Sequence, residues 1–311
     1  MRLGSGVTVV IFDEPATASI DIRGGGPGTR ESALLDPAQT VQGIDAIALS
    51  GGSAFGLDAA SGVQALLREQ GRGFAVGSAR VPIVPGAILF DLLSGGDKAW
   101  GRFPPYRSLG YAAAASAGEQ FSLGSVGAGL GATTVNLKGG IGSASAMYQD
   151  ITIGALAAVN AAGSVTVGDG PSFWAAPFER EGEYGGRGFP SPLPEAALEA
   201  RTKGMARAST TLAVVATDAL LTKAEAHRLA IMAQTGVARA IYPVHTPLDG
   251  DVMFAACTGR KRLRDPLLGL TALGALTANV VSRAIARAVY EAAPLSFPDA
   301  IPSWRQRFGG S

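Results

Sequence analysis

Three hydroxyl side chains stand in a row where a Gly- and Pro-rich segment gives way to an apolar run. They are Ser209, Thr210 and Thr211, in the stretch MARASTTLAVVATDA. If the backbone were cut before Thr210, the freed α-amine, with an ordinary pKa of roughly 7.7–8.0, could serve as general base for its own hydroxyl. The same residues also suit the start of a β-strand, where Thr is common and its hydroxyl bonds backbone groups. On residue types alone, the strand interpretation is favoured.

The chain has few of the residues that histidine- or cysteine-based catalysis needs. The chain has two histidines, His227 and His245, and one cysteine, Cys257. A Ser-His-Asp or Cys-His site would have to use one of these imidazoles, and no Cys/His cluster has zinc spacing. We expect Cys257 to be a small buried apolar residue. No metal or cofactor is expected.

Two glycine-rich stretches come close to known motifs without matching them. GSVGAGLGATT at 124–134 lacks both the G-x-G-x-x-G register and the Lys-Ser/Thr pair of a phosphate-binding loop, so close backbone packing or a tight substrate-facing turn explains it better. SGGSAFG at 50–56 nearly matches the nucleophile elbow G-x-S-x-G, but Phe55 stands where the second Gly belongs. Ser53 is therefore expected to be structural.

Four further polar residues are candidates for a functional site. Asp249 and Asp251 in HTPLDGD are two apart, which puts both carboxylates on one face of an extended segment, and Gly250 leaves room for close approach. Lys138 precedes two glycines, and Asn160 stands in AAVNAAG. Without further information, Asp-Gly-Asp is most often a turn, the lysine a surface turn residue and the asparagine an Asx turn at a strand end.

Composition sets the frame for these residues. A chain of 311 residues with 47% hydrophobic content is long enough for one large α/β domain or two ordinary ones. Only 16% of the residues are charged, well below the roughly 25% of an average domain, and 43 are Gly. Little charged surface favours a permanent oligomer.

Charge and hydropathy exclude several partners. The formal net charge is +1 and no basic run is interleaved with aromatics, so nucleic acid is excluded as a main ligand. The apolar start breaks at Asp13 and Glu14, too early for a signal peptide, and the single cysteine forms no internal disulfide, so a cytoplasmic protein is expected. The apolar segment 267–281 is shorter than the ~20 residues of a membrane span and is expected to be a buried helix.

Strands and helices alternate along the chain. Strands are predicted at 44–52 and 210–219, a pair at 6–12 and 17–24 around a turn at Asp13–Pro15, and another pair within 150–168. Helices are predicted at 56–71, closed by Gly71, at 222–241 with Thr222 as N-cap, and at 266–293. The segment 168–195, rich in Gly, Pro and charge, is either a linker or an active-site loop.

Six blocks in order resemble the signature of one family. They are IRGGGPGTRESALLDP at 22–37, LSGGSAFGLDAASGV at 49–63, VPIVPGAILFDL at 81–92, NLKGGIGSAS at 136–145, STTLAVVATDALLTKAEAHRLA at 209–230 and ARAIYPVHTPLDGD at 238–251. The chain resembles the self-processing L-aminopeptidase/D-amidase family of the DmpA type, peptidase family S58, and most nearly its nylon-oligomer hydrolase branch. The resemblance implies an α/β fold, a four-layer αββα sandwich like that of N-terminal nucleophile hydrolases.

The resemblance also implies roles for the candidate residues. Thr210 matches the nucleophile, exposed when the single catalytic domain 1–311 cuts itself between Ser209 and Thr210 into 1–209 and 210–311. Asp249 and Asp251 match the acids that hold and polarise the threonine. Lys138 matches a lysine that stabilises charge and lowers the pKa of the amine, and Asn160 matches an asparagine that donates to the oxyanion. Family members with a threonine nucleophile usually have Asn before the cut, where this chain has Ser209.

The implied activity is hydrolysis of small linear amides or peptides, such as 6-aminohexanoate oligomers, by a homo-oligomer, a tetramer of processed heterodimers. The alternative is an acyltransferase of the ornithine acetyltransferase kind, which also exposes a Thr by self-cleavage. The two differ in whether water or an amine accepts the acyl group. A non-catalytic scaffold is disfavoured because all five site residues are present together.

Overall fold

The computed structural model describes residues 3–204, 209–298 and 300–309. Eight strands form one hydrogen-bonded sheet, and two short strands, β4 (Phe74–Val76) and β5 (Ala79–Val81), form a separate hairpin. The strand order of the large sheet is β2-β6-β3-β1-β10-β9-β8-β7. Its strands are β1 (Val7–Ile22), β2 (Thr29–Arg30), β3 (Gly43–Ser50), β6 (Gly86–Ile88), β7 (Ile141–Tyr148), β8 (Ile151–Asn160), β9 (Thr210–Ala219) and β10 (Val252–Lys261).

The long strand β1 divides this sheet into two facing halves. Its N-terminal part pairs with β3 and its C-terminal part with β10, so it belongs to both halves. One core cluster joins the halves and contains Ile47 and Leu49 of β3 together with Leu212 and Val214 of β9. The alternate residues of the same strands face outward into two other clusters that contain helix residues.

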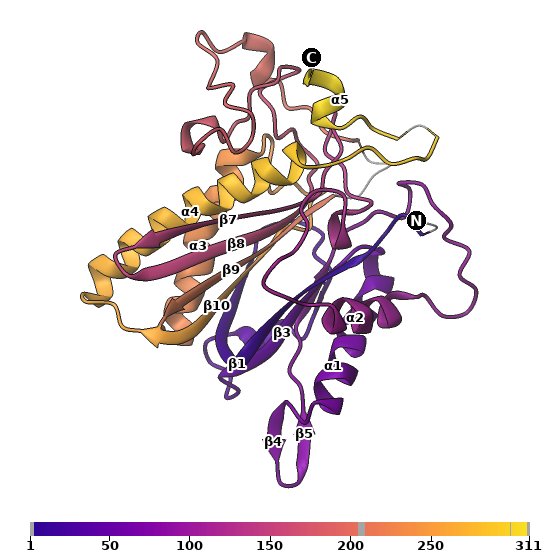
Figure 1. Ribbon diagram of the computed structural model, residues 1–311. Coiled ribbons are helices and arrows are strands. Elements are labelled where there is room, and N and C mark those ends of the chain that lie inside the picture. Colours follow the sequence, from indigo (N-terminus) through magenta and orange to yellow (C-terminus); the bar gives the residue numbers. More distant parts are fainter. Residues whose placement is uncertain (1–2, 205–208, 299, 310–311) are drawn as a thin grey trace.

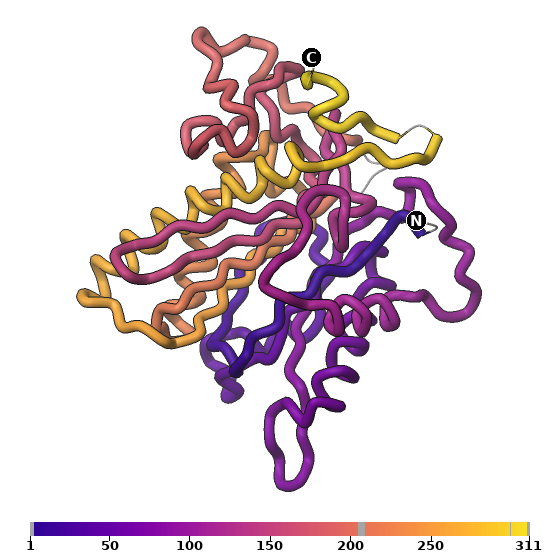
Figure 2. The backbone as a smooth tube through the Cα atoms, in the orientation of Figure 1, coloured from indigo at the N-terminus to yellow at the C-terminus, as the bar shows by residue number. Residues whose placement is uncertain are grey.

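Helices cover both outer faces, as Figures 1 and 2 show. Helices α3 (Lys223–Ala240) and α4 (Pro266–Tyr290) pack on β7–β10, and α1 (Ala59–Glu69) and α2 (Tyr106–Ala115) pack on the half that contains β3. A short C-terminal helix, α5 (Trp304–Phe308), lies beyond the end of α4. The layer order is therefore helix, sheet, sheet, helix, which confirms the αββα expectation.

Local chemistry explains where the helices begin. Thr222 accepts a hydrogen bond from the backbone of Glu225, whose carboxylate bonds back to Thr222, so the predicted N-cap of α3 is a full capping box. Asp265 caps α4 in front of Pro266. By length and composition alone α4 could cross a membrane, but 61% of its apolar window is buried within the protein. It is the buried helix that the sequence predicted.

Two strand predictions were wrong. The Asp13–Pro15 signal is not a hairpin turn, because β1 runs through it as one strand of 16 residues. The register with β3 shifts between Ile11 and Ala16, so the extra residues bulge out of the ladder, where a proline that lacks a backbone donor is tolerated. Within 150–168 only β8 forms, and it pairs with β7 and β9 instead of with the residues that follow it.

Candidate active site

The predicted cut lies where β9 begins, in the interior of the sheet. Ser209 forms a parallel bridge with Asp249, just ahead of β10. Its N–H donates to Leu248 O at 3.2 Å, and its carbonyl oxygen accepts from Gly250 N at 2.8 Å. The hydroxyl of Thr210 donates to the same carbonyl oxygen at 2.5 Å. The carbonyl that self-cleavage would attack is thus polarised by a backbone N–H, with the hydroxyl beside it.

Asp249 and Asp251 are both buried on either side of this contact. Asp251 Oδ1 accepts from the N–H of Thr211 at 2.7 Å. Asp249 Oδ1 accepts from the N–H of Ala162 at 3.0 Å, and its Oδ2 accepts from the hydroxyl of Thr246 at 2.7 Å. The sequence predicted that the two carboxylates lie together; in the structure Asp251 holds the backbone of the nucleophile strand and Asp249 holds the segment that follows β8.

Burial also changes the proton affinity of this pair. Removal from water raises the pKa of Asp249 above its ordinary value, and the charge of Asp251 raises it further. The hydrogen bonds from Thr246 and Ala162 act in the opposite direction. A buried acid with a raised pKa beside a second acid is typical of sites that move protons.

Glycines explain how the chain approaches so closely here. A methyl group added to Gly250 would lie 2.7 Å from Thr210 Oγ1, so the hydroxyl sits directly over the glycine between the two acids. A methyl group at Gly24 would lie 2.2 Å from the backbone nitrogen of Asp251. The loop 23–26 bonds Asp251 O through Arg23 N at 3.1 Å and Asp249 O through Gly26 N at 2.8 Å. The Gly-rich block at 22–37 therefore braces the acidic segment.

Asn160 is the cross-strand partner of Thr210 between β8 and β9. Its amide nitrogen donates to Phe90 O at 2.9 Å, and its amide oxygen accepts from Thr133 N at 3.0 Å and from Lys203 Nζ at 3.0 Å. Three separate segments thus fix this side chain next to the nucleophile. Its position suits an oxyanion donor, although in this structure its N–H bonds a backbone carbonyl.

Lys138 is fully buried, contrary to the surface turn that composition alone favours. Its ammonium donates to three carbonyl oxygens, of Gly129 at 2.9 Å, Ala132 at 2.8 Å and Gly139 at 2.6 Å. Burial lowers the pKa of Lys138 to about 7, and the charge of buried Asp91 partly offsets that effect. The carbonyl groups of Gly129, Ala132 and Gly139 thus point at the ammonium group. Because Gly129 and Ala132 lie within 124–134, Lys138 holds the loop that carries Thr133.

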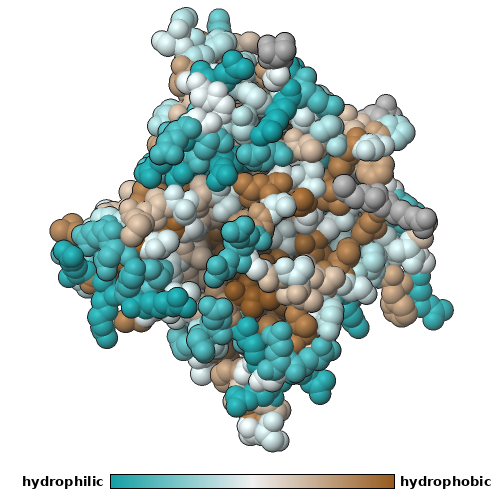
Figure 3. All heavy atoms as spheres, viewed as in Figure 1, coloured by the Kyte–Doolittle hydropathy of each residue, from teal (hydrophilic) through white to brown (hydrophobic). Residues whose placement is uncertain are grey.

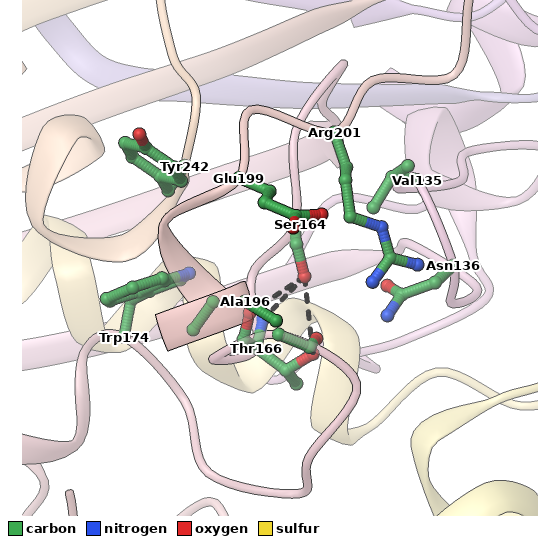
Figure 4. A pocket seen from close by; sticks show the side chains of 11 residues that line it. Val135, Asn136, Ser164, Thr166, Trp174, Ala196, Glu199, Arg201 and Tyr242 are labelled. Carbon is green, nitrogen blue, oxygen red and sulfur yellow. Dashed lines mark hydrogen bonds between the residues drawn. The ribbon is translucent and has the colours of Figure 1, made fainter. Parts of the chain in front are cut away.

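A pocket shown in Figure 4 is lined by none of the five predicted catalytic residues. It has a volume of about 10 Å³, room for about one water, and Val135, Asn136, Ser164, Trp174 and Tyr242 are among its lining residues. A larger cavity of about 430 Å³ adjoins it, sharing the wall formed by Gly168, Ala196, Ala197 and Arg201. Most residues that line the larger cavity come from the segment 168–195, which the sequence left open between linker and active-site loop.

Several contributors were not predicted. The carbonyl of Phe90, the ammonium of Lys203 and the N–H of Gly250 hold the site through backbone or long-range contacts that leave no residue pattern. His245 and Thr246 also bond the acids. The short spacing within HTPLDGD could have indicated these contacts, because Thr246 is three residues from Asp249 and His245 is six residues from Asp251.

Comparisons with known proteins show which proteins this chain is similar to. An uncharacterized aminopeptidase of Mycobacterium bovis is 43% identical over 98% of this chain and 90% of its own length. A 6-aminohexanoate-oligomer endohydrolase of Kocuria sp. is 27% identical over 91% of this chain and 80% of its own length.

Solved structures show the same fold. A beta-aminopeptidase of Burkholderia sp. superposes with a TM-score of 0.70 at 21% identity, covering 98% of this chain and 84% of that one. An L-aminopeptidase D-Ala-esterase/amidase of Ochrobactrum anthropi, described as a variant of the Ntn hydrolase fold, gives 0.67 at 17% identity, covering 98% and 92%. The model of peptidase family S58 matches residues 2–300. The chain therefore belongs to peptidase family S58 and is a peptidase or amidase.

Proposed function

We propose that the chain is an N-terminal-threonine amide hydrolase, activated by self-cleavage between Ser209 and Thr210. The observation that carries the proposal lies at the Ser209 carbonyl oxygen, which accepts from the Thr210 hydroxyl at 2.5 Å and from the Gly250 N–H at 2.8 Å. A donor aimed at a carbonyl oxygen stabilises the negative charge that develops when the carbon is attacked. The flanking acids are available to receive or orient protons.

The cut proceeds by a shift of the acyl group from nitrogen to oxygen. Thr210 Oγ1 bonds to the carbonyl carbon of Ser209, the bond from that carbon to the Thr210 nitrogen breaks, and the hydroxyl proton passes to the nitrogen. Water then opens the ester, leaving a carboxylate on Ser209 and restoring the Thr210 hydroxyl beside a free α-amine. No histidine is needed at either stage.

Substrate turnover repeats the same chemistry on an external amide. The α-amine of Thr210 takes the hydroxyl proton as Oγ1 attacks, the leaving amine receives that proton, and water opens the acyl-enzyme. Asn160 would hold the oxyanion once its amide turns toward the substrate, and Asp249 and Asp251 would orient the new amine. Lys138, whose ammonium bonds three backbone carbonyls, would act by keeping the Thr133 loop and Asn160 in place.

An uncharged aliphatic amide is the substrate class we favour. The two buried carboxylates would repel a strongly anionic acyl chain. The relative named as a 6-aminohexanoate-oligomer endohydrolase supports linear oligoamides, and the relatives named as aminopeptidases support short peptides.

The decisive assay offers three substrates to the processed protein: a 6-aminohexanoate oligomer, an aminoacyl p-nitroanilide, and N-acetylornithine with glutamate. Amine release without an acceptor supports hydrolysis. Acetyl transfer to glutamate with little hydrolysis would move the assignment to the acyltransferase alternative.

Assembly and compartment remain expectations. We propose a homo-oligomer, a tetramer of processed heterodimers, in the cytoplasm. The surface supports self-association, because Figure 3 shows apolar residues gathered across the middle of one face, with hydrophilic ones along the margin. Exposed large apolar side chains include Leu93, Phe103 and Leu267. Light scattering of the purified protein tests the subunit count.

A further inference from the structure

His245 is bound directly to one of the two acids. Its Nδ1 lies 2.8 Å from Asp251 Oδ2, and its backbone N–H donates to the same oxygen at 3.3 Å. An ionised carboxylate only accepts hydrogen bonds, so Nδ1 carries the proton in this contact. The other oxygen, Oδ1, accepts from Thr211 N at 2.7 Å. Asp251 therefore links the imidazole to the residue that follows the nucleophile.

The backbone at His245 is bent to make this contact. Its φ is 54°, in the left-handed region that residues other than Gly seldom adopt, although Asn, Asp and His do so more often than the rest. Such a conformation lasts only where the surrounding structure holds it, and it is common at functional sites. Here it lets the backbone N–H and the ring converge on one oxygen atom.

The next residue does the same for the other acid. Thr246 donates to Asp249 Oδ2 through its N–H at 3.0 Å and its hydroxyl at 2.7 Å. Two adjacent residues thus hold the two acids on either side of Gly250, His245 on Asp251 and Thr246 on Asp249. The two clamps differ in kind, because Asp249 receives uncharged donors and Asp251 receives an ionisable one.

We propose that His245 is a positioning residue of the site, whose imidazole fixes the Asp251 carboxylate and, through it, the backbone at the nucleophile. This inference rests on the proposed function, since it takes Thr210 as the nucleophile. It assigns no step of the reaction to His245 itself. The ring lies outside the reacting groups, with its side chain 21% exposed and the Asp251 side chain 2% exposed. The imidazole therefore stands between solvent and the buried acid.

Three substitutions of His245 separate the effect of its side-chain hydrogen bond from the effect of its backbone conformation. In Asn, Nδ2 occupies the place of the histidine Nδ1, and Asn tolerates the left-handed conformation. His245→Asn thus keeps both donor and backbone, His245→Gly keeps only the backbone, and His245→Asp keeps the shape but presents a third carboxylate. The only other histidine, His227, bonds Ile20 O at 2.9 Å from α3, so His227→Asn is the matched control.

The test measures kcat and KM for amide hydrolysis and the fraction cut before Thr210 by intact mass, with thermal unfolding as a check on folding. We expect His245→Asn and His227→Asn to stay within about threefold of the parent kcat. His245→Gly should lose roughly 10- to 100-fold in kcat, the range of one hydrogen bond to a charged group, with KM nearly unchanged. His245→Asp should lose more.

Two results would overturn the inference: a parental kcat in His245→Gly, or an Asn variant as impaired as the Gly variant at equal thermal stability. If the Gly variant does not fold, the isosteric Asn and Asp variants decide, because equal kcat in those two would exclude a role for the donor. A parent that is uncut and inactive, or a Thr210→Ala variant as active as the parent, would instead refute the proposed function.

Discussion

At the scale of single residues, Thr210 has the most direct consequence. Thr210→Ala removes the hydroxyl that contacts Ser209 O, so we expect one uncut chain without amidase activity. Thr210→Ser keeps a hydroxyl and should still be cut. Intact mass spectrometry checks both, since the parent should give fragments 1–209 and 210–311. A fully active chain that stays whole would contradict the mechanism.

The acidic pair makes a second prediction at this scale. Asp249→Asn and Asp251→Asn each remove a charge beside the nucleophile without emptying space, so turnover should fall by roughly 100-fold or more while the circular dichroism spectrum stays native. Asp265→Asn, which changes only the exposed N-cap of α4, is the matched control and should leave turnover unchanged. Parental rates in both site variants would mean that Asp-Gly-Asp is only a turn.

At the scale of elements, the loop that holds Lys138 should respond to pH. The folded pKa of about 7 lies below the ordinary 10.5, so between these values the unfolded chain binds a proton that the folded chain does not. The free energy of unfolding should therefore rise with pH from about 7 to 10.5, by up to ~1.4 kcal/mol per unit. Below about 7 both states are protonated and the full desolvation cost remains.

Lys138→Met isolates this contribution, because it removes the titrating amine and leaves the other ionisable groups in place. Denaturant unfolding at pH 6.5 and 9 should show a smaller rise for the variant than for the parent. An equal rise in both proteins would show that the ammonium keeps its ordinary pKa. The three carbonyl acceptors would then outweigh its burial.

The C-terminal segment 302–308 anchors two parts of the fold, the loop at Lys138 through Pro302 and the segment 171–173 through Trp304 of α5. Pro302 O accepts from Lys138 N at 2.8 Å, and the indole of Trp304 donates to Pro171 O at 3.0 Å while its ring stacks on Phe173. Trp304→Ala should destabilise the fold by about 3–5 kcal/mol, as expected for a buried aromatic ring. Chemical denaturation measures the loss. Phe308→Ala should cost less, because that partly buried ring packs at the edge of the same cluster.

The sequence predicted elements where the physical cause is local. Thr222 and Glu225 form a capping box within one turn, and the run from Thr210 to Ala219 is β-branched and apolar, so both were recognisable. Asp13–Pro15 misled because a bulge and a hairpin turn use the same residues, and only the long-range pairing of β1 distinguishes them. The burial of Lys138 depends on three distant carbonyls, which no residue pattern records.

At the scale of the whole molecule, the two fragments should remain one body after the cut. The second fragment supplies β9 and β10, and these strands pair with β8 and β1 of the first. Separating the fragments would break two strand ladders and the core between the sheet halves. We expect co-elution on native size exclusion and a single cooperative denaturation, with separate fragments only in denaturant. Native elution as two species would contradict this topology.

The bridge between Ser209 and Asp249 joins residues 40 positions apart through the finished sheet. A chain that has not threaded β10 beside β9 cannot bring Gly250 to the Ser209 carbonyl, so under the proposed mechanism it cannot unmask its own amine. Each molecule would then become catalytically active only after it had folded correctly. A cell would carry no stray hydrolase from misfolded or half-synthesised chains, and the ratio of cut to uncut protein would serve as an internal gauge of folding quality.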